Sequence, residues 1–208
     1  MSGSTNIDRR SERRQATINE ILAAAWDQVR EHGLSGLAMR DLGERVGMRA
    51  QSLYSYFSSK HEIYDAMFLQ GNEAFVEWMR AVSDPATVPS GPVANAHDAA
   101  HRYFEFCISD PVRYQLLFQR TIPDFIPSAH SYAVAQEAYD MVLGRLRALG
   151  ITDSGVDLWT AVIAGLVAQQ LSNEPGGDRW ARLLDEAVDM LIATLAPQLL
   201  GTKPTRRT

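Results

Sequence analysis

The stretch Gly47-Met-Arg-Ala-Gln-Ser-Leu-Tyr-Ser-Tyr-Phe-Ser-Ser-Lys60 decides how the first part of this chain folds. Apolar residues recur at helical spacing over 39–46 and predict a short helix that ends at the glycine. A second short helix is predicted over 50–57, so that only residues 47–49 lie between the two. A three-residue turn containing glycine between two short helices predicts a helix-turn-helix unit.

The segments on either side of this unit also carry helical patterns. An amphipathic helix is predicted over 15–32, and the capping-box pattern Ser59-x-x-Glu62 predicts the start of a long helix that ends near residue 83. The segment 84–92 contains three prolines and one glycine, which interrupt any helix. No segment alternates long enough to be a strand, and no internal repeat is visible. The fold class is therefore all-α with about nine helices, the later ones at 93–109, 111–120, 128–149, 154–173 and 178–199.

Composition narrows the class of protein. The chain has 208 residues, 46% of them hydrophobic and 22% charged, which is ordinary for a soluble globular protein. Its single cysteine, Cys107, cannot form an intrachain disulfide, and its longest apolar run, Ala161–Ala168, is far shorter than the roughly 20 residues of a membrane span. No apolar stretch follows the first arginines, so no signal peptide is expected. We expect a cytoplasmic protein without a membrane partner.

The charge is unevenly distributed along the chain. The net charge is −5, but residues 1–60 hold nine Lys and Arg against seven Asp and Glu, whereas residues 61–208 are acidic. The first 60 residues can therefore approach a phosphate backbone that would repel the rest. Arginines cluster in the first 13 residues, which are expected to form a flexible basic arm. A solubilising tail is the alternative interpretation of that cluster.

The second helix of a helix-turn-helix unit enters the major groove, while its buried side holds it on the first helix. Leu53 and Phe57, four residues apart, are the expected buried anchors. Gln suits adenine, Arg suits guanine, and tyrosine hydroxyls and a nearby Lys suit phosphates. Packing of the small domain is the alternative for the tyrosines. The predicted DNA-binding residues are Arg40, Arg49, Ala50, Gln51, Ser52, Tyr54, Ser55, Tyr56 and Lys60.

The segment 47–60 resembles the recognition-helix signature of TetR-type transcriptional regulators. The resemblance extends over about residues 14–74, from the Ile21-Leu-Ala-Ala-Ala25 run through the Gly33 break to the Ser59-Lys60 boundary. It implies a homodimer whose N-terminal domains bind a palindromic operator, and a C-terminal domain that senses a small ligand. The implied domains are a 1–13 arm, a 14–74 DNA-binding domain, a 75–200 ligand-binding and dimerisation domain, and a 201–208 tail.

Two positions depart from the family pattern. The family often has Ser or Thr near position 38 and Ser at position 49, where hydroxyls cap the two short helices. This chain has Ala38 and Arg49 instead. A lost cap costs about 1 kcal/mol, which a packed domain can absorb. Arg49 could instead donate to phosphate or guanine, so the departures affect the fine geometry of the unit more than its assignment.

Aromatic residues are frequent in the C-terminal helices. Such side chains line apolar ligand cavities, although each one alone is more often a core residue. Together with the resemblance, the set predicts a pocket for a small apolar or aromatic ligand whose identity the sequence does not give. The predicted pocket residues are Tyr103, Phe104, Phe118, Phe125, Tyr132, Tyr139 and Trp159.

Apolar and small residues also recur on the last two long helices. Two such helices from each of two chains could form a four-helix bundle, the dimer surface that the resemblance implies. The alternative is that the pair packs on its own domain. The predicted interface residues are Ala161, Gly165, Ala168, Leu184, Val188, Leu191 and Leu195.

Metal and enzyme chemistry find little support in the sequence. His97 and His101 have a spacing that can chelate zinc, but no second spaced pair accompanies them, so no metal or cofactor is predicted. No nucleophile elbow, zincin motif, phosphate loop or dinucleotide fingerprint is present, so no enzyme is expected. The chain is predicted to be a ligand-responsive transcriptional regulator that acts as a repressor. The alternatives are an activator, or a helical ligand-binding or interaction protein that does not bind DNA.

Overall fold

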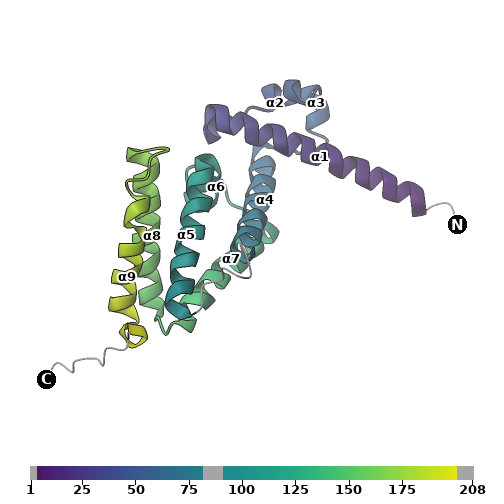
Figure 1. The fold of residues 1–208 in the computed structure, drawn as a ribbon. Helices are drawn as coiled ribbons and strands as arrows, with labels where there is room; N and C mark the ends of the chain where they lie inside the picture. The colour runs from purple at the N-terminus through teal and green to yellow at the C-terminus, as the bar shows by residue number, and fades with distance from the viewer. Residues whose placement is uncertain (1–3, 82–90, 201–208) are drawn as a thin grey trace. The chain divides into compact units, whose positions relative to one another are not determined.

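The computed structural model of the chain describes residues 4–81 and 91–200 (Figure 1). These ranges hold nine α-helices, three short 3₁₀ helices and no strand, which confirms the predicted all-α fold class. The α-helices are α1 (Ser4–His32), α2 (Met39–Arg45), α3 (Ala50–Leu53), α4 (Lys60–Arg80), α5 (Pro92–Ser109), α6 (Pro111–Phe118), α7 (Ala129–Ala148), α8 (Asp153–Asn173) and α9 (Leu184–Leu195). The 3₁₀ helices are Leu34–Gly36, Ala181–Leu183 and Pro197–Leu200.

Helix α1 is longer than the sequence pattern predicts. It begins at Ser4, so residues 4–13, predicted to be a flexible arm, continue the first helix. These residues include no glycine or proline, and their three arginines and one glutamate are good helix formers. Extending an existing helix adds a hydrogen bond per residue without a new nucleation cost. The prediction of an arm is therefore corrected to a helical extension.

The chain divides into two compact units. The N-terminal unit comprises Met1–Gly71 and Gln115–Tyr132, and the C-terminal unit comprises Asn72–Tyr114 and Ala133–Thr208. The first boundary lies close to the predicted one at 74. The structure differs from the prediction in placing the second segment, 115–132, with the N-terminal unit. The predicted tail at 201–208 lies outside the described residues.

The core of the N-terminal unit forms where α1, α2, α3 and the first half of α4 bury their apolar faces. Its fully buried members include Ile21 and Val29 of α1, Leu42 of α2, and Ile63 and Met67 of α4. The i, i+3, i+4 spacing along α1 places one apolar stripe toward the shorter helices. This core fixes the position of α3.

The segment 115–132 closes part of the same unit. Phe125 packs edge-on against Tyr64 and Phe68 of α4, with ring centroids 5.9 and 6.2 Å apart. The Asp65 carboxylate accepts hydrogen bonds from the Ser128 backbone N–H at 2.7 Å and from the Ser131 hydroxyl at 2.9 Å. These contacts tie the start of α7 to α4.

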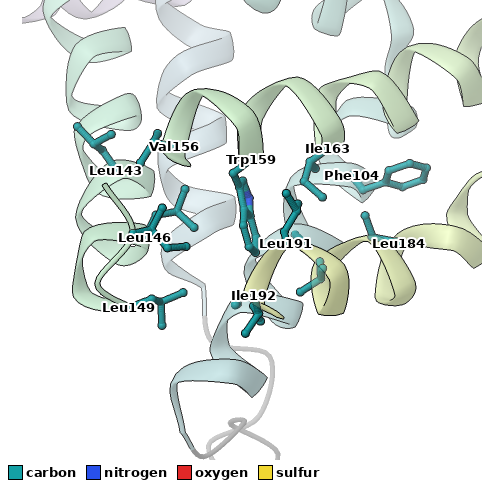
Figure 2. Close-up of a cluster of buried hydrophobic side chains, with 14 of the residues drawn as sticks. Phe104, Leu143, Leu146, Leu149, Val156, Trp159, Ile163, Leu184, Leu191 and Ile192 are labelled. Carbon is teal, nitrogen blue, oxygen red and sulfur yellow. The ribbon is translucent and has the colours of Figure 1, made fainter. Parts of the chain in front are cut away.

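The C-terminal unit has a larger apolar core. Helices α5, α7, α8 and α9 contribute to it, and Figure 2 shows Trp159 of α8 lying among aliphatic side chains of α7 and α9. Cys107 of α5 is fully buried in this core, and burial raises the pKa of its thiol to about 12. Arg102 is also buried, and it donates hydrogen bonds to the Trp78 and Ala81 carbonyls at the end of α4. That guanidinium satisfies carbonyls that have no partner within the helix.

Within the described ranges, no single helix is long and apolar enough to span a membrane. The bent pair Ala129–Ala148 and Asp153–Asn173 meets that test jointly, by length and composition, with a bend of 113°.

Candidate nucleic-acid interface

The turn between α2 and α3 depends on two glycines. Gly47 has φ 66°, a conformation that favours glycine. Its N–H donates to the Glu44 carbonyl at 3.2 Å, and the Met48 N–H donates to the Gly43 carbonyl at 2.8 Å, which is a Schellman C-cap. A Cβ on Gly43 would lie 2.9 Å from the Met48 carbonyl oxygen, so α2 and the turn are in contact there. The two glycines thus allow α3 to follow α2 at close range.

Neither short helix has a side-chain cap. The N-cap residues are Ala38 for α2 and Arg49 for α3, and neither side chain makes a capping hydrogen bond. The hydroxyl caps that the family pattern often provides are therefore absent, as the sequence indicates. Arg49 is exposed, and its guanidinium extends from the start of α3.

One side of α3 is buried and the other is exposed. The predicted anchors Leu53 and Phe57 are 0% and 6% exposed, which confirms their role. Gln51 and Ser52 are exposed, and the Tyr54 side chain is 48% exposed. Polar groups capable of base contacts therefore project from the side opposite the anchors.

The α-helical part of α3 is shorter than predicted. It covers Ala50–Leu53, and residues 54–56 continue as turns. The backbone changes there to i to i−3 hydrogen bonds, from the Ser55 N–H to Ser52 at 3.1 Å and from the Tyr56 N–H to Leu53 at 2.9 Å. The chain nevertheless brings Phe57 back into the core, so the division between buried and exposed sides is retained.

Arg14 of α1 contacts the end of this element, a contact that the sequence pattern did not indicate. Its guanidinium lies 4.9 Å from the centroid of the Tyr56 ring and donates to the Ser55 carbonyl at 3.3 Å. A stacked arginine and a backbone hydrogen bond together fix the end of the α3 segment on α1. The i to i+42 separation explains why no local pattern could predict the pair.

Besides Tyr56, three of the predicted DNA-binding residues have side chains that make contacts within the unit. Lys60 is half-buried and donates to the Ser35 carbonyl at 3.2 Å, and burial lowers the pKa of its ammonium group. The Ser55 hydroxyl donates to the Ser52 carbonyl at 2.7 Å. Arg40 pairs with Glu44 at 3.2 Å, with 84% of the arginine side chain exposed. Arg40 can leave Glu44 and bind a phosphate at little cost in free energy, because the pair is exposed. Lys60, by contrast, has a structural role that the sequence did not indicate.

The seven predicted pocket residues do not form one group. Phe118, Phe125 and Tyr132 belong to the N-terminal unit and the other four to the C-terminal unit. Phe104 and Trp159 are members of the C-terminal core, where they are 2% and 5% exposed, and Tyr103 packs against it. Phe118, Tyr132 and Tyr139 are substantially exposed. The aromatic pocket stays a prediction.

The predicted interface residues separate into two sets. Leu184, Val188 and Leu191 are 0–2% exposed in the core of their own unit, so their assignment to a dimer surface is wrong. The apolar face of α9 packs on α5 and α8 of the same chain, which removes it from any partner. Leu195 also packs against this core, partly buried. On α8, by contrast, Ala161 is exposed, and Gly165 and Ala168 are half-buried.

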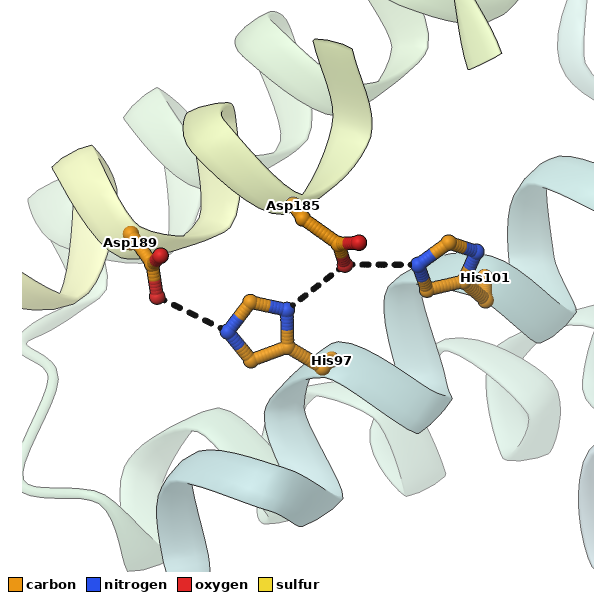
Figure 3. A network of polar contacts seen from close by, with 4 residues as sticks. All are labelled: His97, His101, Asp185 and Asp189. Atoms are coloured by element: carbon orange, nitrogen blue, oxygen red, sulfur yellow. Dashed lines mark hydrogen bonds and ion pairs between the residues drawn. The ribbon is translucent and has the colours of Figure 1, made fainter. Parts of the chain in front are cut away.

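A cluster of two histidines and two aspartates joins α5 to α9 (Figure 3). The two ring nitrogens of His97 lie 2.9 Å from carboxylate oxygens of Asp185 and Asp189, and His101 lies 2.7 Å from Asp185. Hydrogen bonds from His101 and His97 hold the pKa of Asp185 below its usual value. Both contacts of His97 are hydrogen bonds only when its ring is an imidazolium, because a neutral imidazole has one N–H.

Among the described residues no group of three or more His, Cys, Asp or Glu could hold a metal ion. An open depression lies beside the cluster, lined by Gly91, Pro92, Val93, Ala94, His97, Asp98, His101, Asp185 and Leu199. None of the predicted pocket aromatics lines it.

Comparison with known proteins supports the assignment of the N-terminal unit. Residues 21–67 match the family described as bacterial regulatory proteins, tetR family. The HTH-type transcriptional activator FasR of Mycolicibacterium smegmatis is 27% identical over 161 residues, which cover 76% of this chain and 69% of FasR. The HTH-type transcriptional regulator Mb1846 of Mycobacterium bovis is 21% identical over 125 residues, 60% of this chain and 53% of Mb1846. The chain thus spans about half to two thirds of the length of these relatives.

Two solved structures have the same fold. A protein of unknown function from Rhodococcus sp. RHA1 has a TM-score of 0.68 and 17% identity, covering 86% of this chain and 95% of that one. The transcriptional regulator FadR from Bacillus subtilis, in complex with stearoyl-CoA, has a TM-score of 0.60 and 14% identity, covering 85% and 98%.

The anchored and exposed sides of α3, with the tight turn that precedes it, define a helix-turn-helix protein. The match over residues 21–67 narrows this class to one type of helix-turn-helix protein. Residues 21–67 thus place the N-terminal unit with the tetR family of bacterial regulatory proteins, and the chain is a transcriptional regulator of that type.

Proposed function

We propose that the chain is a ligand-responsive regulator that binds a palindromic DNA operator as a homodimer. The observation that carries this proposal is α3, whose anchors are buried while Gln51, Ser52 and Tyr54 project outward. A recognition helix that is held rigidly on its domain can enter the major groove without losing its own packing.

The exposed residues divide between base and backbone contacts. Gln51 suits adenine, Arg49 suits guanine, and Ala50 can touch a thymine methyl. The Tyr54 and Tyr56 hydroxyls suit phosphate oxygens, which would set the position of the helix without reading sequence. The stacking of Arg14 on Tyr56 supports this assignment because it orients that ring before DNA is bound.

Exposed apolar and small residues on α8 and α9 support a homodimer. Leu158 and Met190 are 46% and 55% exposed, and Ala161 is exposed on the same helix as Leu158. A Cβ built on Gly165 meets no atom within 4 Å, so a second helix could approach closely there. A C2 pairing of these helices would hold two α3 segments at a fixed separation.

A small apolar ligand would act by differential affinity. A ligand that favours a dimer whose α3 segments no longer match the operator lowers DNA affinity by its preference for that state. The FadR structure with stearoyl-CoA supports an apolar ligand as the class to test first. FasR is named as an activator, which supports testing the chain for both activation and repression. Repression is our proposal.

The test is an in vitro selection of random duplex DNA with the purified full-length chain. We expect enrichment of two inverted half-sites, and a shift of preference at one base position with Gln51→Ala. Arg179→Ala is the control, because Arg179 is exposed in the C-terminal unit. Absence of any enriched sequence, with a correctly folded protein, would favour a helical interaction protein instead.

Sedimentation of the same sample tests the dimer. We expect a dimer at micromolar concentration, and weaker association with Leu158→Asp. A strictly monomeric protein that still selects inverted half-sites would contradict pairing through α8 and α9.

A further inference from the structure

Four arginines lie on one face of the helical extension of α1. At about 100° per residue, Arg9, Arg10, Arg13 and Arg14 fall within an arc of about 140°. Glu12 lies outside that arc. Figure 1 shows the extension as one continuous rod with the rest of α1. We call this surface the arginine face.

Most of the arginine face makes no side-chain contact with the rest of the N-terminal unit. Residues 9–16 are all exposed, so this part of α1 packs against no described element apart from the contacts of Arg14. None of the ion pairs between described side chains involves an arginine of this face. These cations are therefore surplus to the stability of the unit, in a chain whose net charge is −5.

Arg14 sets the direction of the arginine face. It contacts the Ser55 carbonyl and the Tyr56 ring at the end of the α3 segment. Arg10 lies one helical turn before Arg14 on the same side of α1. The arginine face therefore begins at the recognition element and continues outward along α1, away from the segment 21–67 that matches the family.

The spacing of the cations indicates an extended polyanion as the partner. From residue 9 to residue 14 the helix rises by about 7.5 Å, so the four guanidinium groups do not converge on one small anion. A membrane surface is disfavoured, because a membrane-binding helix needs a large apolar face, and residues 9–16 have only Ala16 as an apolar residue. A DNA backbone offers phosphates in a row and lies beside any helix in the major groove.

We propose that the arginine face binds backbone phosphates flanking the half-site that α3 contacts, which makes α1 a second DNA-binding element. The proposal rests on the proposed function, because it needs α3 to dock on DNA. Arg14 is a positioning residue that holds Tyr56, while Arg9, Arg10 and Arg13 contact phosphates. Such contacts raise affinity for every sequence and leave base preference unchanged.

The experiment uses the full-length chain and a duplex selected from random DNA by that chain. The variant is Arg9→Gln, Arg10→Gln and Arg13→Gln combined, which keeps Arg14 and the good helix propensity of each position. The matched control is Arg120→Gln, Arg179→Gln and Arg182→Gln combined. These three arginines are exposed elsewhere, so the net charge changes equally. Dissociation constants are measured from 50 to 400 mM KCl, with circular dichroism as the folding check.

The arginine-face variant should bind the selected duplex at least about tenfold more weakly at 100 mM KCl, with a salt slope smaller by about 2 to 3 per protomer, because each phosphate contact contributes about 0.9. The ratio of affinities for selected and scrambled duplexes should not change. The control should bind like the unaltered chain.

Equal affinities and slopes for the variant and the control would overturn the proposal while leaving the proposed function intact. A loss of sequence preference in the variant would also overturn it, because base readout would then depend on the arginines. Loss of binding to anionic phosphatidylglycerol vesicles without loss of DNA binding would assign the face to a membrane. Failure of the unaltered chain to select any duplex would instead count against the proposed function itself.

Discussion

The two units of this chain use charged side chains in opposite ways. At the start of α1 in the N-terminal unit, Arg9, Arg10 and Arg13 are exposed, and no described carboxylate forms an ion pair with them. Between α5 and α9 of the C-terminal unit, two histidines and two aspartates bind one another. The first arrangement leaves its charge available to a partner, and the second holds two helices of one chain together.

The paired charges of the C-terminal unit act in folding, whereas the unpaired arginines at the start of α1 are available for binding. A charge that is paired within the chain has already lost part of its hydration, so a ligand gains little by replacing its partner. An exposed cation without a partner contributes little to stability, but releases counterions when it meets a phosphate. Substitutions in the N-terminal unit should therefore divide sharply between those that unfold it and those that weaken DNA binding.

The largest expected effect comes from two neighbouring residues of α3. Leu53→Ala should lower the free energy of unfolding by about 2 to 5 kcal/mol, because Leu53 is fully buried. Tyr54→Ala should cost less than about 1 kcal/mol, because Tyr54 is 48% exposed, but should weaken DNA binding. Urea denaturation and DNA titration measure the two effects. Similar losses of stability in both variants would contradict the anchored orientation of α3.

Lys60→Ala tests the cation of this unit that is paired internally. It should lower the free energy of unfolding by about 1 kcal/mol, because the Ser35 carbonyl loses its hydrogen bond. Its effect on the salt dependence of DNA binding should be smaller than that of Arg49→Ala, since Arg49 is exposed. A larger salt effect for Lys60 would show that its ammonium group leaves Ser35 to bind phosphate.

A smaller effect is expected from Asp185→Asn, through the pH dependence of stability. The pKa of Asp185 is lowered in the folded chain by hydrogen bonds from His101 and His97. Its contribution is therefore present above the unfolded pKa of about 4 and is lost as pH falls through the folded value. The side chain is 66% exposed, so the contribution is below about 1 kcal/mol.

The measurement is urea denaturation from pH 7 down to pH 3. The variant should lose less stability over this range than the unaltered chain. Glu186→Gln on the next residue is the control, and its profile should follow that of the unaltered chain. An unchanged profile for Asp185→Asn would show that the cluster contributes nothing to folding.

The smallest effect is expected from Arg13→Gln. Arg13 is exposed and has no ion pair among the described side chains. The free energy of unfolding of the variant should therefore differ from that of the unaltered chain by less than about 0.5 kcal/mol. Thermal denaturation measures this. A clear loss of stability would show that the arginine face supports the fold and would remove the contrast between the two units.

The fold was largely predictable because helix periodicity and breakers are local signals. Gly47 ends a helix and the capping box at Ser59 begins one where the sequence indicated, whereas residues 84–90 of the proline-rich segment lie outside the described residues. The capping hydrogen bond forms from the Glu62 N–H to the Ser59 hydroxyl at 3.2 Å. The start of α1 was missed because the absence of a breaker over residues 4–13 carries no positive pattern.

The candidate site was predictable only where burial is decided within one short helix. The spacing of Leu53 and Phe57 fixed which side of α3 faces outward. The apolar stripe of α9 gave no such guidance, because Leu184 and Leu191 serve equally well against their own chain or a second copy. Contacts across long separations in sequence, such as Arg14 with Tyr56, had no local signal at all.

Cys107 has a practical consequence as the single thiol of the chain. Because it is fully buried in the C-terminal core and its pKa is about 12, it holds its proton and is closed to alkylating reagents in the native state. Maleimide labelling of the unaltered protein therefore records, without any engineered probe, how often that core opens to solvent.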